Sequence, residues 1–164
     1  MYVRPAKPED IERMIEVYAM AKRYMDASGN ETQWKPGYPG RAVIEEDIEK
    51  GWAYVCVENE VVHGVFEFFM GGDPTYQVID GAWQNDRPYA TVHRVAGSGE
   101  VRGVFEAMIN YVKDRCDNVR MDTHENNHTM QHLFEKHGFK KCGTIWLADG
   151  RPRWAYHYVN LKKA

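Results

Sequence analysis

The hydrophobic residues of this chain follow two spacings, which predict helices in some segments and strands in others. In the first helical segment Ile11, Met14 and Ile15 recur at intervals of three or four positions with charged residues between them. Pro8, just before this run, is typical of a helix start. Helical spacing predicts four helices, over residues 9–26, 42–50, 101–116 and 126–137.

Segments rich in Val, Phe and Tyr predict the strands. Trp52–Glu58 and Val61–Met70 are separated only by Asn59 and Glu60, so we expect an antiparallel hairpin. Strands are expected over residues 2–4, 52–58, 61–70, 89–96, 119–123, 139–147 and 153–161. The resulting order, β, α, α, β, β, β, α, β, α, β, β, predicts a mixed sheet with helices on both faces.

Length and charge limit the classes of protein that fit. A chain of 164 residues with 43% hydrophobic residues predicts one domain over residues 1–164. The net charge of -3 comes from 24 acidic and 21 basic residues spread along the chain, so we expect no nucleic-acid partner. No apolar run approaches the roughly 20 residues of a membrane span, and the start shows no signal-peptide pattern. We therefore expect a cytoplasmic protein without a membrane partner.

One short motif suggests metal chemistry. His124, Glu125 and His128 have the H-E-x-x-H spacing of zinc hydrolases, which need both histidines on one helical face. The strand pattern over residues 119–123 places His124 in or just past a strand, with Asn126 or Asn127 as the helix cap. We therefore expect no zinc site and no other metal.

The segment from His93 to Ala107 joins a predicted strand to a predicted helix through a turn that contains glycine. The free N–H groups and the positive end of the dipole at such a helix start suit a pyrophosphate. The segment Arg102-Gly103-Val104-Phe105-Glu106-Ala107 resembles the (Q/R)-x-x-G-x-(G/A) loop of the GNAT N-acetyltransferase superfamily. Asn127 followed by Leu133-Phe134-Glu135-Lys136-His137-Gly138-Phe139 is similar to the N…L-Y-E-K-x-G-F of that family, and the element order is also its own.

This resemblance covers nearly the whole chain and implies both a fold and an activity. The fold is an α/β (α+β) single domain, with a mostly antiparallel sheet and a splayed pair of parallel strands that end at Ala96 and Thr123. The activity is transfer of acetyl from acetyl-CoA, as co-substrate, to a primary amine of a small molecule or amino-acid-like acceptor by direct attack. The resemblance implies that the Val95 N–H faces the thioester carbonyl. The implied cofactor-binding residues are Val95, Ala96, Gly97, Arg102, Gly103, Val104, Phe105, Glu106, Ala107 and Asn127.

Three residues depart from the family pattern. Phe105 replaces a glycine, Glu106 adds a negative charge beside the expected phosphates, and Phe134 replaces the usual tyrosine acid. Tyr156 or a water molecule is expected to supply the missing acid, although a thiol with a pKa of about 8.5 leaves readily without help. The alternative function is a CoA-binding regulatory module without turnover.

Two histidines are candidates for the general base, because imidazole accepts a proton near pH 7. His93 lies two residues before Val95 on the predicted strand, and His124 ends the facing strand. A structural, hydrogen-bonded role for His93 is an equally open interpretation.

Trp34, Tyr38 and Trp83 lie in the two segments that the family places over its acceptor site. An aromatic wall suits an ammonium-bearing substrate, but such residues also pin loops to a core. Arg153, together with Asp80 and Arg94, supplies either a charge for an acceptor carboxylate or a buried ion pair, and we favour the ion pair. GNAT relatives are often dimers, which leaves a homodimer open.

Overall fold

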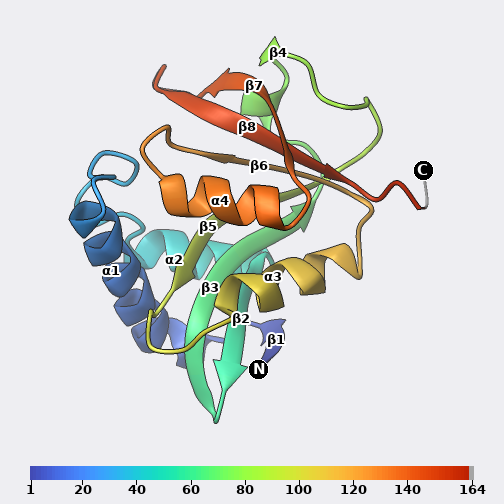
Figure 1. The fold of residues 1–164 in the computed structure, drawn as a ribbon. Helices are drawn as coiled ribbons and strands as arrows, with labels where there is room; N and C mark the ends of the chain where they lie inside the picture. The colour runs from blue at the N-terminus through green and yellow to red at the C-terminus, as the bar shows by residue number, and fades with distance from the viewer. Residues whose placement is uncertain (163–164) are drawn as a thin grey trace. The chain divides into compact units, whose positions relative to one another are not determined.

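The computed structural model describes residues 1–162, and Figure 1 shows its strands and helices. The elements, in chain order, are β1 (Tyr2–Pro5), α1 (Ile11–Ala27), α2 (Arg41–Glu49), β2 (Ala53–Glu58), β3 (Val61–Met70), β4 (Asp80–Gly81), β5 (Ala90–Gly97), α3 (Val104–Lys113), β6 (Asn118–Thr123), α4 (His128–Lys136), β7 (Lys140–Trp146) and β8 (Pro152–Val159). Short 3-10 turns cover Pro8–Asp10 and Pro74–Tyr76. The strand order is β1-β2-β3-β5-β6-β8-β7-β4.

The sheet is mixed. Strands β5 and β6 run parallel, whereas the pairs β1–β2, β2–β3, β6–β8, β7–β8 and β4–β7 are antiparallel. The chain forms two compact units: the first contains residues 1–68 and 93–112, and the second contains residues 69–92 and the chain from residue 113 onward. Strands β3 and β5 each pass from one unit into the other.

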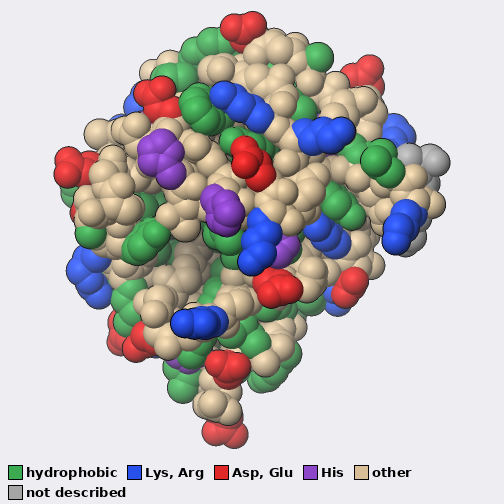
Figure 2. Space-filling model, viewed as in Figure 1, with side chains coloured by type: hydrophobic (Ala, Val, Ile, Leu, Met, Phe, Trp, Pro, Cys, Tyr) green, Lys and Arg blue, Asp and Glu red, His purple; other side chains and the backbone are tan. Residues whose placement is uncertain are grey.

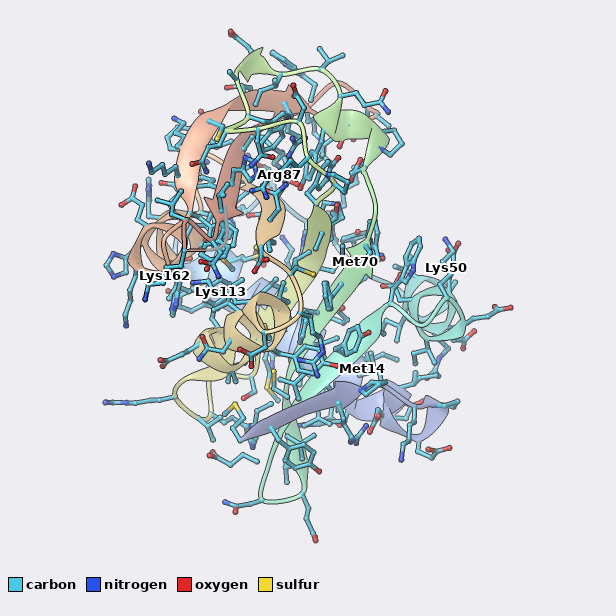
Figure 3. The ribbon with its side chains drawn as sticks, turned by 90° about the vertical axis from the view of Figure 1, so that its right-hand side faces the viewer. Met14, Lys50, Met70, Arg87, Lys113 and Lys162 are labelled. Atoms are coloured by element: carbon cyan, nitrogen blue, oxygen red, sulfur yellow. The ribbon has the colours of Figure 1, made fainter. Side chains whose placement is uncertain are left out.

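In the first unit, helices pack on both faces of the β2–β3 hairpin. Met14, which Figure 3 labels on α1, is buried in one core cluster with Val55 of β2. On the opposite face Tyr111 of α3 lies 5.4 Å from Tyr54, between ring centroids. Gly64 of β3 lets α3 pack closely on this face, because a Cβ at that position would lie 2.5 Å from Val104 Cγ1.

In the second unit, α4 packs against β8. The ring of Phe134, which is fully buried, lies 4.7 Å from that of Tyr156. A second contact joins His157 of β8 to Asn118 of β6, where His157 Nε2 and Asn118 Oδ1 are 2.6 Å apart. Figure 1 shows β6, β8 and β7 side by side in this unit, as their pairing requires.

The mixed α/β fold predicted from the sequence is confirmed, with three differences in detail. The prediction did not include β4, which has only two residues and pairs Asp80 with Thr144. Helix α3 begins at Val104 rather than at residue 101, because Gly103 has a φ of 80° and cannot continue a helix. Helix α4 likewise begins two residues later than predicted, at His128.

No helix within residues 1–162 has the length and apolar character of a membrane span. Figure 2 shows basic and acidic side chains together on the face that it draws.

Candidate functional site

Strand β5 contains one residue with an irregular backbone, Arg94, whose φ is 50°. This is the left-handed region, which is strained for a residue with a side chain and costs about 1–2 kcal/mol. The parallel pairing of β5 with β6 consists of Ala90 with Val119 and Thr91 with Arg120, after which β5 continues to Gly97 and β6 to Thr123. The irregular residue therefore lies in the part of β5 that leads to the candidate site.

The Arg94 side chain makes four hydrogen bonds within the first unit. Its Nε and Nη2 donate to the two oxygens of Asp47 on α2, at 3.0 and 2.7 Å. Nη2 also donates to Glu67 Oε2 on β3 at 2.5 Å, and Nη1 donates to the Tyr38 hydroxyl at 3.1 Å. One guanidinium thus joins α2, β3 and the loop before α2 to the strained residue of β5.

These contacts change the pKa values of Glu67 and Arg94. Burial raises the pKa of Glu67 to about 7, and a hydrogen bond to Asp47 acts in the same direction against the opposing charge of Arg94. Burial disfavours the charged form of Arg94, but the bond to Asp47 and the charge of Glu67 outweigh it and raise its pKa. Arg94 therefore stays charged, while Glu67 exchanges its proton near neutral pH.

Beyond β5, a second group of contacts holds the turn that leads to α3. Ser98 N–H donates to His63 O at 2.8 Å, and His63 Nδ1 lies 3.0 Å from Ser98 Oγ. The Glu100 N–H donates to Ser98 Oγ at 3.1 Å, while the Glu100 carboxylate accepts from Arg13 Nη2 at 2.6 Å. Two elements, α1 and β3, thus fix this turn from outside.

The start of α3 fits a phosphate group. The Ala107 N–H donates to Gly103 O at 3.0 Å, so the N–H groups before it are the ones that a helix start leaves without an intrahelical partner. The Arg102 side chain is exposed, and none of residues 1–162 makes an ion pair or hydrogen bond with it. Val104 and Phe105 are buried, so the Phe105 ring is part of the core rather than of the exposed turn.

In the second unit, His124 lies one residue beyond β6 and outside α4. Its Nδ1 accepts a hydrogen bond from the Asn126 N–H at 3.0 Å. Burial and the charge of Arg153 lower its pKa, so the ring is neutral at pH 7, and its proton must lie on Nε2. Neither nitrogen of that tautomer has a free lone pair, which makes His124 a poor proton acceptor.

Asn127 caps α4. Its Oδ1 accepts from the Met130 N–H at 3.0 Å, which is the usual bond of a helix N-cap. The side chain of Gln131 fixes the same turn, because it donates to the carbonyls of His124 and Glu125 at 3.2 and 2.9 Å.

Tyr156 lies beside the phenylalanine that replaces the family tyrosine. Residue Tyr156 is 1% exposed, and burial raises its pKa, so its hydroxyl is protonated at neutral pH. No residue among 1–162 hydrogen-bonds that hydroxyl. The ring centroids of Phe134 and Tyr156 are 4.7 Å apart. Tyr156 therefore places a phenol next to Phe134, which has no hydroxyl of its own.

Comparison with solved structures gives a close match. An acetyltransferase of the GNAT family from Streptococcus agalactiae 2603 is 32% identical to this chain with a TM-score of 0.87, over 96% of this chain and 94% of its own. The chain belongs to the GNAT family of acetyltransferases. A Staphylococcus aureus Mu50 protein described as an acetyltransferase matches at 27% identity with a TM-score of 0.69, over 96% and 98% of the two chains.

A more distant match shows the GNAT fold alone. Naa20 from Chaetomium thermophilum, solved in complex with a bisubstrate analogue, is 12% identical with a TM-score of 0.69, over 99% of this chain and 90% of its own. No protein-family model and no curated protein matches the sequence.

The aromatic residues expected at the acceptor site of this GNAT chain fall into two groups. Trp34 is buried in the core of the first unit, and its ring lies 6.0 Å from that of Tyr38, which is 37% exposed. Trp83 belongs to the second unit, where its Nε1 donates to Tyr76 O at 2.9 Å and its ring lies 4.3 Å from the Arg120 guanidinium carbon. Of the three, Tyr38 is exposed, Trp83 is half-buried and Trp34 is buried.

Arg153 is buried on β8 of this GNAT fold, and its Nη1 donates to Pro152 O at 2.8 Å. Burial lowers its pKa, and the charge of Asp122 opposes that effect. Asp122 itself accepts a 2.6 Å hydrogen bond from the Tyr76 hydroxyl. Of the three charged residues considered together from the sequence, Arg94 forms the buried ion pair, with Asp47 and Glu67 as its partners.

The H-E-x-x-H spacing does not correspond to a helical pair in this GNAT chain. His128 is the first residue of α4, whereas His124 lies before the cap, so the two do not share a helical face. Within residues 1–162 no three His, Cys, Asp or Glu side chains gather as a metal site would require.

Asp47 and Glu67 are not among the site residues predicted from the sequence. The sequence gives one indication for Glu67, because it is the one acidic residue in the mostly apolar segment Val61–Met70. Asp47 had none, because an acid on an amphipathic helix is normally solvated.

Proposed function

We propose that the protein transfers the acetyl group of acetyl-CoA to a primary amine of a small-molecule or amino-acid-like acceptor by direct attack. The observation that carries this proposal is the junction between β5 and α3. There an exposed Arg102, the N–H groups at the start of α3 and a strained β5 end follow one another within the first unit. Family membership supports the donor, because GNAT acetyltransferases use acetyl-CoA.

The proposed cofactor-binding residues contact different parts of acetyl-CoA. The N–H groups at the start of α3 and the Arg102 cation hold the pyrophosphate, which needs both hydrogen-bond donors and positive charge. The exposed Glu106 carboxylate weakens this attraction, and the pair between Glu100 and Arg13 keeps a second carboxylate from adding to that repulsion. The Val95 N–H faces the reacting carbonyl, and Asn127 contacts the pantetheine arm.

When bound, acetyl-CoA supplies an activated acyl group and a thiol leaving group. His93, which is half-buried on β5, accepts the proton of the attacking ammonium. The charge of His93 acts on Glu67, so the histidine lies within electrostatic reach of this buried carboxyl group. The bond between His124 and Asn126 favours His93 over His124 in this role.

Tyr156 is the proposed proton donor to the leaving thiol. Its phenol is protonated at neutral pH, and it lies against Phe134 rather than in a separate part of the second unit. This arrangement supports turnover despite the replacement of the family tyrosine.

The acceptor residues in this proposal are Trp34, Tyr38, Trp83 and Arg153. Tyr38 offers an exposed ring face to an ammonium, and Arg153 offers a buried cation to an acceptor carboxylate. The cytoplasmic location remains part of the same proposal.

The regulatory module without turnover is the second candidate. It was motivated by Phe105, Glu106 and Phe134, but the buried Phe105 ring does not occupy the exposed turn, and Tyr156 offers a substitute phenol. These two observations favour the enzyme.

Release of free thiol from acetyl-CoA across a panel of primary amines tests the function. We expect release that depends on the acceptor, with the largest rates for amines that also carry a carboxylate. Tight CoA binding by calorimetry without any acceptor-dependent release contradicts turnover and favours the module.

A further inference from the structure

The contacts of Arg94 imply a role for two acids that lie on other elements. Asp47 on α2 and Glu67 on β3 have side chains that are 7% and 4% exposed, so neither is placed to meet solvent. Both bind the same guanidinium, with Nη2 of Arg94 shared between them. Burying a carboxylate away from water costs free energy. Two buried carboxyl groups around one guanidinium therefore suggest a specific structural role for this cluster.

The reason lies in the backbone of Arg94. Asn59 and Glu60, the other residues apart from glycine with positive φ among residues 1–162, form the tight turn between β2 and β3. Arg94 is instead inside a strand, and a strained conformation of this kind persists only when the surroundings hold it. Two carboxylates and the Tyr38 hydroxyl hold its side chain from three separate segments.

The residue after Arg94 is Val95, whose N–H is the proposed donor to the reacting carbonyl. A peptide group next to a strained residue takes its orientation from that residue, because φ and ψ of Arg94 set the direction of the following plane. We infer that Asp47 and Glu67 are positioning residues, which act through Arg94 to orient the Val95 N–H for catalysis. This inference rests on the proposed function.

Asp47→Asn and Glu67→Gln test the inference, because both keep the size of the side chain and remove its charge. Glu46→Gln is the matched control, since Glu46 lies beside Asp47 on α2 but pairs with Lys50 at the exposed end of that helix, where Figure 3 labels Lys50. The kinetic readout is kcat for acceptor-dependent thiol release, with calorimetry giving the dissociation constant and stoichiometry of CoA.

A donor that acts in the transition state affects kcat rather than cofactor binding. We therefore expect both charge variants to lose about tenfold or more in kcat, since small misplacements of catalytic groups have effects of that order or larger. The CoA dissociation constant is expected to stay within about twofold with unchanged stoichiometry, which shows that the protein is folded. Equal losses in CoA affinity and kcat, or no loss at all, overturn the positioning role.

A second readout does not depend on turnover. In ¹⁵N–¹H spectra of the free protein, the Val95 amide resonance is expected to move in Asp47→Asn and Glu67→Gln and to stay in place in Glu46→Gln. An unmoved Val95 resonance in both charge variants overturns the inference even if the enzyme is active. If the wild-type protein releases no thiol with any amine while the Val95 resonance moves as expected, the proposed function fails and the structural role of the two acids stands.

Discussion

At the scale of the residue, Arg94 combines an unfavourable backbone conformation with four side-chain hydrogen bonds. Substitution by Ala removes the bonds and keeps the strain, whereas substitution by Gly removes both. Because Gly adopts positive φ without a Cβ penalty, we expect Arg94→Gly to be more stable than Arg94→Ala by about 1 kcal/mol. Urea unfolding of the two variants measures this difference, and an Ala variant as stable as the Gly variant contradicts the strain.

Glu67 makes a prediction about pH. Burial raises its pKa from the ordinary 4.5 to about 7 in the folded protein, so between these values the folded state holds a proton that the unfolded state has lost. The free energy of unfolding contributed by this residue therefore falls as pH rises from 4.5 to 7, and it is constant outside that window. We expect the stability of the wild type relative to Glu67→Gln to fall over that window, measured by urea unfolding. A difference that is flat or rises with pH contradicts the raised pKa.

Tyr156 and Phe134 allow a test by exchange. Removal of the phenol in Tyr156→Phe is expected to lower kcat about tenfold or more, since a positioned acid typically contributes at least that much. Adding Phe134→Tyr to this variant returns a phenol to the neighbouring ring, 4.7 Å away between centroids, and is expected to restore part of the rate. If Tyr156→Phe has the wild-type kcat, the leaving thiol needs no acid from this side chain.

At the scale of the element, hydrophobic spacing was a good guide wherever a segment was long. Strands and helices of six or more residues were predicted within about three residues of their ends, because burial on one face fixes the pattern. Strand β4 could not be predicted: its two residues are held by the close approach of Gly81 to Gly143, which depends on chain far away in sequence.

The candidate site shows the same division. The turn before α3 and the cap Asn127 have local signatures that the sequence displays. The partners of Arg94 do not, since Asp47, Glu67 and Tyr38 come from three segments and meet only in the folded unit. Their roles depend on long-range contacts that have no spacing rule.

Asn127 at the start of α4 permits separation of a structural role from a binding role. Asn127→Ala loses the hydrogen bond to Met130 N–H, which is expected to cost about 1 kcal/mol of stability. Asn127→Ser keeps a capping oxygen and should retain most of that stability. If the carboxamide also contacts the pantetheine arm, both variants raise the KM for acetyl-CoA about two- to tenfold. A Ser variant with wild-type KM limits Asn127 to capping.

At the scale of the whole molecule, the two compact units share strands. Each has its own buried core, with Met14 and Val55 in one and Tyr76 and Ile145 in the other. Yet β3 and β5 supply residues to both units, so unfolding one unit removes strand residues that continue directly into the other. Continuous strands of this kind couple the stabilities of the segments that they join.

We therefore expect residues 1–164 to unfold as one domain. For 164 residues the calorimetric enthalpy should be roughly 115 kcal/mol near 60 °C, and it should equal the van't Hoff enthalpy if no intermediate accumulates. Labelling the five tryptophans with fluorine gives a separate resonance for each, including Trp34 in the first unit and Trp83 in the second. A common midpoint for these resonances is the expected result. Separate midpoints for Trp34 and Trp83, with a calorimetric enthalpy above the van't Hoff value, mean that the units unfold independently and that the single-domain prediction is wrong.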